Sequence, residues 1–294
     1  MKKRYVLIGR VVALTIIGLI VTIIASAVTP QPEIVRTAQN SGNSTNAILL
    51  LLVERLVVAL VFAFILETTV VRGWKLAGYM LWAVFGITTF MTQIETIIFG
   101  SAFPGLSVPD VLMLVLTAFV GTVIYVPLAI LVMGKWKGTN PPIRPLFKKD
   151  YLPRVALIAV IYPAIYFFFG FFVAWQSAAV REFYATSTIT TAQPLLTIIQ
   201  IVRGALWVFV ALPLLVMFDK RWQTIVAVTA SYSLFTSIVL IVPNPLMPAP
   251  VAHAHLIELA LSMALFGLIT GWIMTGIKPV NKQILNSNKK HTEV

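Results

Sequence analysis

Long apolar runs separated by short polar segments recur along the whole chain. A helix needs about 20 apolar residues to cross the hydrocarbon core of a bilayer. Runs of about this length cover residues 11–28, 47–69, 77–93, 111–134, 155–175, 194–217, 223–242 and 254–276. They are too long and too uniformly apolar for the alternating strands of a membrane β-barrel. Because lipid offers the backbone no hydrogen-bond partner, the pattern predicts an all-α polytopic membrane protein with eight transmembrane helices.

The composition of the chain agrees with this prediction. Of the 294 residues, 59% are hydrophobic and 11% are charged, whereas about 25% of the residues in a soluble protein are charged. The absence of cysteine excludes disulfides, thiolate metal sites and cysteine catalysis, and three histidines leave little for metal or haem chemistry. We therefore expect no metal and no cofactor.

The basic residues lie almost entirely on one side of the predicted membrane. They cluster near the N-terminus, at 72–75, at 135–154, at 220–221 and after 277, whereas the opposite loops hold Arg36 and Arg181. Because Lys and Arg are retained on the cytoplasmic side, we predict a cell-membrane protein, in the inner membrane, with both termini cytoplasmic. This topology explains the formal charge of +12, so no nucleic-acid partner is needed.

The N-terminal segment has two interpretations. A basic start, an apolar run and Ala25-Ser26-Ala27 resemble a secretory signal peptide with its cleavage site. The alternative is a retained first transmembrane helix, and an internal repeat favours it.

The second half of the chain resembles the first at a shift of 144 to 148 residues. The paired features are Arg10 with Arg154, Val35-Arg36 with Val180-Arg181, Arg55 with Arg203, and Trp74 with Trp222. Four helices in each half would give both halves the same orientation, which is a parallel repeat about an axis along the membrane normal. Since apolar helices align easily by chance, two unrelated four-helix halves remain the alternative.

The repeat suggests a division of the chain into four parts. These are a first membrane half at 1–138, a basic cytoplasmic linker at 139–153, a second membrane half at 154–280 and a cytoplasmic tail at 281–294.

Two arginines lie inside predicted spans. At a rise of 1.5 Å per residue, Arg55 and Arg203 would lie roughly 12–14 Å below the outer surface. A charge at such a depth costs at least about 2.5–3.5 kcal/mol, so each arginine must face protein or water and find a partner. Glu54 projects about 100° away from Arg55 around the helix, so the two need not pair.

Other polar residues share the outer half of the predicted bundle. Gln200 precedes Arg203 by three residues and shares its helix face. His255, Glu258 and Ser262 form one polar stripe along the last predicted span. Glu95, at the outer end of the third span, is a further candidate partner for the arginines. The candidate ligand-binding residues are Arg55, Arg203, Glu258, His255, Glu54 and Gln200.

These residues have a functional and a structural interpretation. Guanidinium groups bind carboxylate or phosphate through two hydrogen bonds, so two related arginines would suit an anionic group near the repeat axis. Glu258 with His255 would suit a proton relay or an acid–base pair. Alternatively, Arg55 and Arg203 form salt bridges with Glu54 and Glu258 that hold helices in register.

The sequence leaves three function classes. The leading one is a transporter or ligand-binding protein with an outward-side intramembrane site for a small anionic or amphipathic ligand. The second is a membrane-embedded enzyme that uses His255 and Glu258 on a lipid or quinone-like substrate, and the third is a non-catalytic scaffold. A Ser262-His255-Glu258 hydrolase is disfavoured, because all three residues share one helix and nothing marks an oxyanion hole. The sequence does not indicate the oligomeric state.

Overall fold

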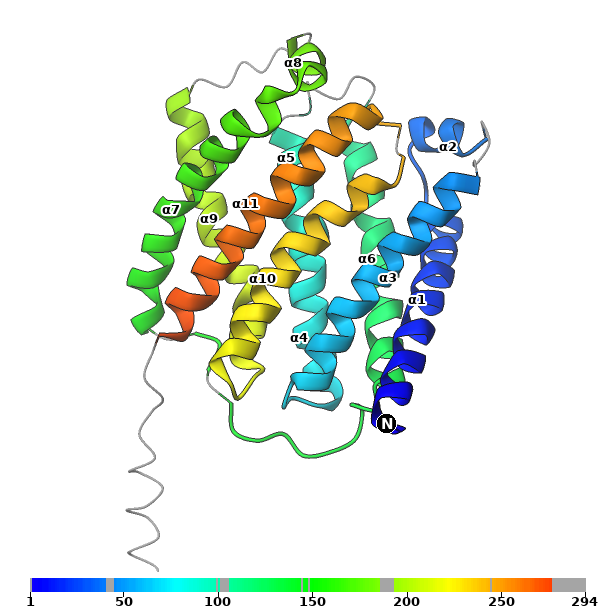
Figure 1. Cartoon of the computed structure of the whole chain (residues 1–294), viewed down its shortest axis with the longest axis vertical. Helices are drawn as coiled ribbons and strands as arrows, with labels where there is room; N and C mark the ends of the chain where they lie inside the picture. The colour runs from blue at the N-terminus through cyan, green and yellow to red at the C-terminus, as the bar shows by residue number, and fades with distance from the viewer. Residues whose placement is uncertain are drawn as a thin grey trace, which may run out of the picture.

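The protein is an all-helical bundle in a computed structural model (Figure 1). The structure describes residues 2–40, 45–98, 100, 106–143, 145–147, 149–185, 193–243 and 245–276. The predicted tail at 281–294, and with it the basic residues after 277, lies outside the described residues, as do Arg144 and Lys148 of the linker.

Eight helices in the described part of the chain are long and apolar enough to cross a membrane, so the prediction of a multi-pass membrane protein is confirmed. Each overlaps one of the predicted apolar runs. They are α1 (Lys2–Val28), α3 (Thr45–Thr68), α4 (Gly73–Phe85) continued by the π-helix η1 (Gly86–Phe90) and α5 (Met91–Ile98), α6 (Val108–Val132), α7 (Leu152–Phe172), α9 (Gln193–Val216), α10 (Arg221–Ser237) continued by the 3₁₀-helix η5 (Ile238–Ile241), and α11 (Ala249–Thr275).

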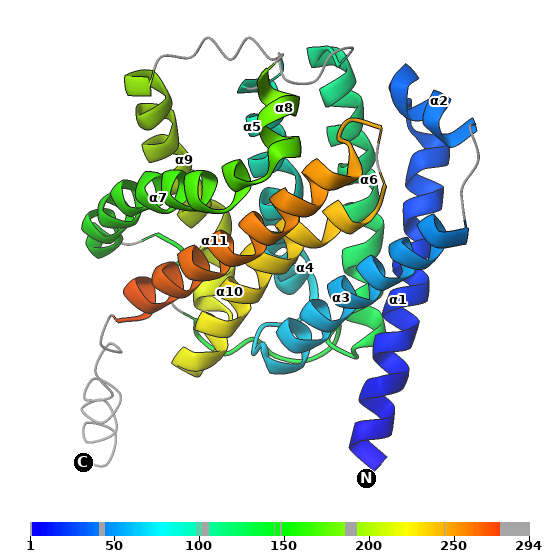
Figure 2. The ribbon, with the colours of Figure 1, turned by 45° about the horizontal axis from the view of Figure 1, so that its top comes forward.

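Two short helices, which the apolar runs did not indicate, lie at one end of the bundle. They are α2 (Glu33–Asn40) and α8 (Ala178–Ala185), and they lie at the end opposite the N-terminus (Figures 1 and 2). A 3₁₀-turn, η4 (Ala174–Gln176), leads into α8, and another, η3 (Lys149–Tyr151), leads into α7. We call the α2/α8 end the far end, and the end where α1 begins the basic end.

The spans pack mostly with partners from the same half of the chain. In the first half, α1 contacts α3 and α6, and α6 contacts α4; in the second, α7 contacts α9 and α11, and α10 contacts α11. Between the halves, α3 contacts α10 and α4 contacts α9. One hydrophobic core runs through both halves, with Phe62, Ile130, Tyr232 and Phe266 almost completely buried.

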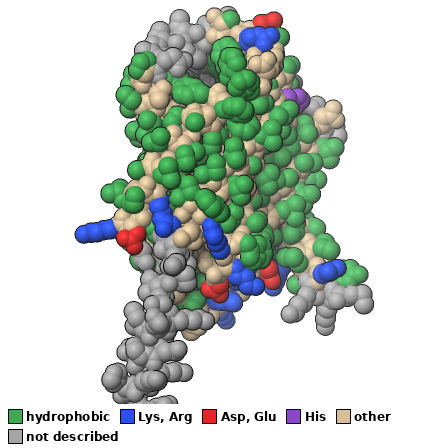
Figure 3. All heavy atoms as spheres, turned by 60° about the vertical axis from the view of Figure 1, so that its left-hand side comes forward, with side chains coloured by type: hydrophobic (Ala, Val, Ile, Leu, Met, Phe, Trp, Pro, Cys, Tyr) green, Lys and Arg blue, Asp and Glu red, His purple; other side chains and the backbone are tan. Residues whose placement is uncertain are grey.

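The surface of the bundle has the distribution of a membrane protein. Hydrophobic side chains cover the lateral face in Figure 3, and charged side chains gather at its lower end, the basic end. A continuous apolar face of this kind fits the predicted bilayer environment.

At the basic end, cationic side chains bind the backbone carbonyls that the ends of helices leave unpaired. Lys135 donates from Nζ to the carbonyl oxygens of Glu67 (3.1 Å) and Thr69 (3.2 Å) at the end of α3. Arg154 donates to the carbonyl oxygen of Ile273 (2.7 Å) near the end of α11. These contacts place positive charge against the negative ends of helix dipoles, which stabilises both partners.

Candidate functional site

Arg203 is the most deeply buried charged group of the described residues. Its side chain, on α9, is only 3% exposed, and it binds Glu95 of α5 through both of its terminal nitrogens. Nη1 lies 3.2 Å from Oε1 and Nη2 lies 2.8 Å from Oε2. This two-point geometry matches the planar fork of a guanidinium to the edge of a carboxylate. The Glu95 side chain is 34% exposed, so one partner of the pair remains accessible.

Two more side chains complete the surroundings of Arg203. Nη1 donates to Oε1 of Gln200 at 2.8 Å, which is the contact expected from their three-residue spacing on one helix. Gln200 is completely buried, and its Nε2 has no hydrogen-bond partner within the described part of the chain. The ring of Tyr162 on α7 lies 5.8 Å from the guanidinium carbon, within the range of a cation–π contact.

The π-helix in the third span helps to place Glu95. One extra residue in a helical turn rotates the rest of the helix by about 100°, so α5 presents a different face from the one that an unbroken helix would present. The turn starts at Gly86, where an added Cβ would lie 2.7 Å from Cβ of Val210 on α9. The third span therefore packs closely against α9 at Gly86. The next segment of that span, α5, places Glu95 beside Arg203.

A second polar chain runs from α11 to the short helix α8. Nδ1 of His255 lies 2.8 Å from Oε2 of Glu258, and Nε2 lies 3.2 Å from the hydroxyl of Tyr184. His255 and Glu258 share a face of α11, as their three-residue spacing predicts. The Glu258 side chain is 10% exposed and that of His255 is 17% exposed, so these hydrogen-bonded side chains are mostly but not completely buried.

Arg203 with its partners and the Tyr184–His255–Glu258 chain lie close enough to interact electrostatically. Burial raises the pKa of Tyr184, and the nearby carboxylates of Glu95 and Glu258 raise it further, because a second negative charge there would be repelled. Tyr184 is therefore protonated at neutral pH. We call Glu95, Tyr162, Tyr184, Gln200, Arg203, His255 and Glu258 together the Arg203 cluster.

Arg55 forms a different ion pair. Its Nε lies 2.5 Å from Oε2 of Glu54, so the flexible arginine side chain folds back across the angle that separates the two residues on α3. Here the acid is the buried partner, with the Glu54 side chain 5% exposed and that of Arg55 26% exposed. Gly18 on α1 makes room for the pair, since a Cβ there would lie 3.3 Å from Cδ of Arg55 and 3.4 Å from Tyr125 of α6.

The six candidate residues from the sequence thus divide between two places. Arg203, Gln200, His255 and Glu258 lie in the Arg203 cluster, whereas Arg55 and Glu54 lie between α3, α1 and α6. Among the described residues, the contacts of Arg55 and those of Arg203 have no residue in common. The partner of Arg203 is Glu95, one of the candidate partners that the sequence indicated, whereas Tyr184 was not singled out at all.

The chemistry available in the Arg203 cluster is anion binding and proton transfer. Within the described residues, no three His, Asp or Glu side chains are grouped as metal ligands would be. An arginine cannot release its proton, so it acts as a fixed cation, while imidazole, carboxylate and phenol groups can exchange protons.

Comparison with protein families, curated proteins and solved structures finds no match to this chain.

Proposed function

We propose that this protein is a membrane transporter or ligand-binding protein whose site for a small anionic or amphipathic ligand is centred on Arg203. One observation carries the proposal. A guanidinium with 3% of its surface exposed is held by a carboxylate with 34% of its surface exposed. Charged groups inside membrane spans mark ligand or ion pathways by default, because keeping them there is expensive.

The exposed carboxylate suggests an exchange mechanism. A ligand carboxylate or phosphate offers Arg203 the same two-oxygen edge that Glu95 offers now. Because Glu95 is accessible, it can turn toward water as the ligand enters, and the buried arginine is never left without an anion. The unpaired Nε2 of Gln200 is a further donor for the ligand in this arrangement.

The site in this proposal opens toward the outside of the cell membrane. The basic end of the bundle faces the cytoplasm by the distribution of lysine and arginine, so the Arg203 cluster near the far end faces outward. A proton on the Tyr184–His255–Glu258 chain would lower the local negative charge and favour an anionic ligand.

A parallel repeat would provide the two-state framework that many transporters use. Several contacts support it. The carbonyl oxygen of Met217 accepts hydrogen bonds from Oγ1 of Thr69 and from N of Val70, and Thr69 and Met217 are 148 residues apart, the shift that relates Arg55 to Arg203. The α3–α10 and α4–α9 contacts between the halves exchange under the same operation. The short helices α2 and α8 follow the first span of each half.

The proposal is tested by thermal unfolding of the purified protein with a panel of small carboxylates, phosphates and anionic amphiphiles. A ligand of the right class raises the unfolding temperature of the parent protein. Arg203→Gln should abolish that shift. Glu95→Gln should enlarge it, because the ligand no longer competes with a resident carboxylate. Arg55→Gln is the matched control, since it removes the related arginine of the first half and should preserve the shift.

The outcomes separate the function classes. If no anion stabilises the parent protein, and Arg203→Gln and Glu95→Gln only lower its stability, the cluster is structural and the scaffold interpretation holds. The Tyr184–His255–Glu258 chain favours an enzyme as the second candidate, because it joins three groups that can exchange protons. An enzyme would require that His255→Ala stops turnover of a lipid or quinone-like substrate while leaving its binding intact.

A further inference from the structure

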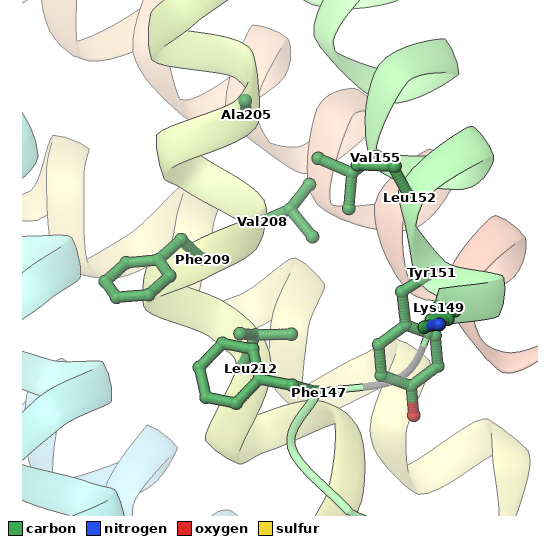
Figure 4. Close-up of a pocket in the computed structure, with 9 residues that line it drawn as sticks. All are labelled: Phe147, Lys149, Tyr151, Leu152, Val155, Ala205, Val208, Phe209 and Leu212. Atoms are coloured by element: carbon green, nitrogen blue, oxygen red, sulfur yellow. The ribbon is translucent and has the colours of Figure 1, made fainter.

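A groove of about 490 Å³ lies between α7 and α9 in the half of the bundle nearer the basic end (Figure 4). One wall is formed by Leu152 and Val155 at the start of α7, and the other by Ala205, Val208 and Leu212 of α9. The lining of the groove is otherwise aromatic or apolar, apart from Lys149 and the Tyr151 hydroxyl. The groove reaches Ala205, two residues along α9 from Arg203, but it shares no lining residue with the Arg203 cluster. Its interpretation does not depend on the function proposed for that cluster.

The groove exists because the two helices touch at one point and then diverge. At Gly204 an added Cβ would lie 2.8 Å from Cα of Ala159, so the backbones are in close contact there. Nearer the basic end, the groove lies between the two helices. Ala205, Val208 and Leu212 follow one face of α9 at helical spacing and line a depth of about 10 Å at 1.5 Å per residue.

The groove is polar at one end and apolar at the other. Lys149 belongs to η3, immediately before α7, and so lies at the basic end of the groove, whereas Ala205 lies at the other end, toward the middle of α9. Figure 4 shows Lys149 and Tyr151 together near the start of α7. An occupant must therefore be apolar along its length and carry a polar or negative group at the basic end.

We propose that this groove binds an anionic phospholipid, with one acyl chain against Val208 and Leu212 and the phosphate at Lys149. Both helices are membrane spans, so lipid is the apolar molecule that surrounds the groove at the highest concentration. Basic pockets between spans bind anionic headgroups in this way. The volume lies within the range of about 300–1,000 Å³ that is typical of ligand pockets.

Trp82 lies beside the groove, so its fluorescence can report whether a lipid chain occupies the groove. The Trp82 ring centroid lies 4.9 Å from that of Phe209 and 6.4 Å from that of Phe147, and both phenylalanines line the groove. Bromine atoms on an acyl chain quench nearby tryptophan. The full-length protein would be placed in phosphatidylcholine bilayers containing increasing small fractions of phosphatidylglycerol with brominated chains. The part of the signal that Trp82→Phe removes is the Trp82 signal, among seven tryptophans in the chain.

We expect Trp82 quenching to saturate at a low fraction of brominated phosphatidylglycerol, and to need a much larger fraction of brominated phosphatidylcholine. Lys149→Gln should weaken the preference for phosphatidylglycerol by about fivefold, the usual effect of one lysine near an anionic lipid. Lys137→Gln, at an exposed lysine of the same end, should not. Ala205→Leu should reduce quenching by filling the groove, whereas Ala164→Leu on the exposed face of α7 should leave it unchanged.

Equal quenching by the two brominated lipids would overturn the proposal, since the groove would then hold only bulk lipid. Selective quenching that survives both Lys149→Gln and Ala205→Leu would overturn it equally, because the selective site would lie elsewhere.

Discussion

At the scale of single residues, the two intramembrane arginines are paired in opposite senses. In the pair of Arg203 and Glu95 the cation is the buried partner, whereas in the pair of Arg55 and Glu54 the anion is. The cost of breaking an ion pair depends on which partner is left behind, because a buried charge without a partner cannot be hydrated. The accessible partner is the one that a ligand or water can replace.

This difference predicts two opposite orders of stability. Glu95→Gln leaves a buried guanidinium that cannot lose its proton, which should cost about 3–5 kcal/mol of unfolding free energy. Arg203→Gln leaves an accessible carboxylate and should cost less. On α3, Arg55→Gln leaves the buried Glu54 carboxylate without its ion-pair partner. It should therefore lower the unfolding free energy more than Glu54→Gln does. Unfolding of the four variants in one detergent measures both orders, and the same order in both pairs would contradict the argument.

Tyr184 predicts an alkaline limit to stability. Its pKa in the folded protein lies above the value of about 10 for a free tyrosine, so the folded state keeps a proton that the unfolded chain loses. The contribution of the hydroxyl is fully present below pH 10 and is lost as the pH rises further, by at most about 1.4 kcal/mol per pH unit. The stability difference between the parent and Tyr184→Phe should be constant from pH 7 to 9.5 and shrink above pH 10. A difference that stays constant to pH 11 would show that the hydroxyl is not shielded.

Sequence periodicity predicted contacts within one helix but not those between helices. The three-residue spacings correctly placed Gln200 beside Arg203 and His255 beside Glu258. The partners Glu95 and Tyr184 come from α5 and α8, and nothing in the spacing of charges indicates which helices will be neighbours. The pairing of Glu54 with Arg55 depends on an arginine rotamer, which residue spacing does not determine.

At the scale of elements, the π-helix η1 is the least regular part of the third span. π-turns are costly and often accompany functional sites, and this one lies between the close contact of Gly86 with Val210 and the ion pair of Glu95. The element therefore joins a tight packing constraint to the position of a charged group.

The close contact at Gly86 is testable by adding one methyl group. Gly86→Ala would place Cβ 2.7 Å from Cβ of Val210 and should destabilise the protein by about 1–3 kcal/mol through overpacking. Gly78→Ala on α4 is the matched control, since no atom lies within 4 Å of its added Cβ, and it should be neutral or slightly stabilising. Val210→Gly removes both the Cβ at 2.7 Å and the Cγ1 at 2.8 Å, so it should offset part of the loss in the double variant. Additive effects would show that the two residues do not interact.

The spanning elements were predictable and the short ones were not. Long apolar runs identify spans because nothing else satisfies both lipid and the backbone. The ends were less certain, since α1 starts at Lys2 while the first apolar run starts at residue 11; helical hydrogen bonding continues into polar residues. The eight-residue helices α2 and α8 are too short to stand out from the periodicity of a loop.

At the scale of the whole molecule, the distribution of charge distinguishes the two ends of the bundle. The bundle presents an apolar lateral face and gathers its cationic side chains at the end where α1 begins (Figure 3). The Arg203 cluster occupies the opposite half, and the proposed lipid groove begins at the cationic end. The two proposed sites would therefore meet different sides of the membrane, one open to external solutes and one to the anionic inner leaflet.

The orientation itself is testable because the chain has no cysteine. Glu182→Cys on α8 and Lys137→Cys in the segment after α6 place single exposed thiols at the far end and the basic end. The excess of lysine and arginine predicts that the basic end faces the cytoplasm. A membrane-impermeant maleimide should therefore label Glu182→Cys in intact cells, and Lys137→Cys only after permeabilisation. The unlabelled parent chain is the control. The reverse pattern would put the Arg203 cluster on the cytoplasmic side and would turn the proposed binding of external anions into binding from within the cell.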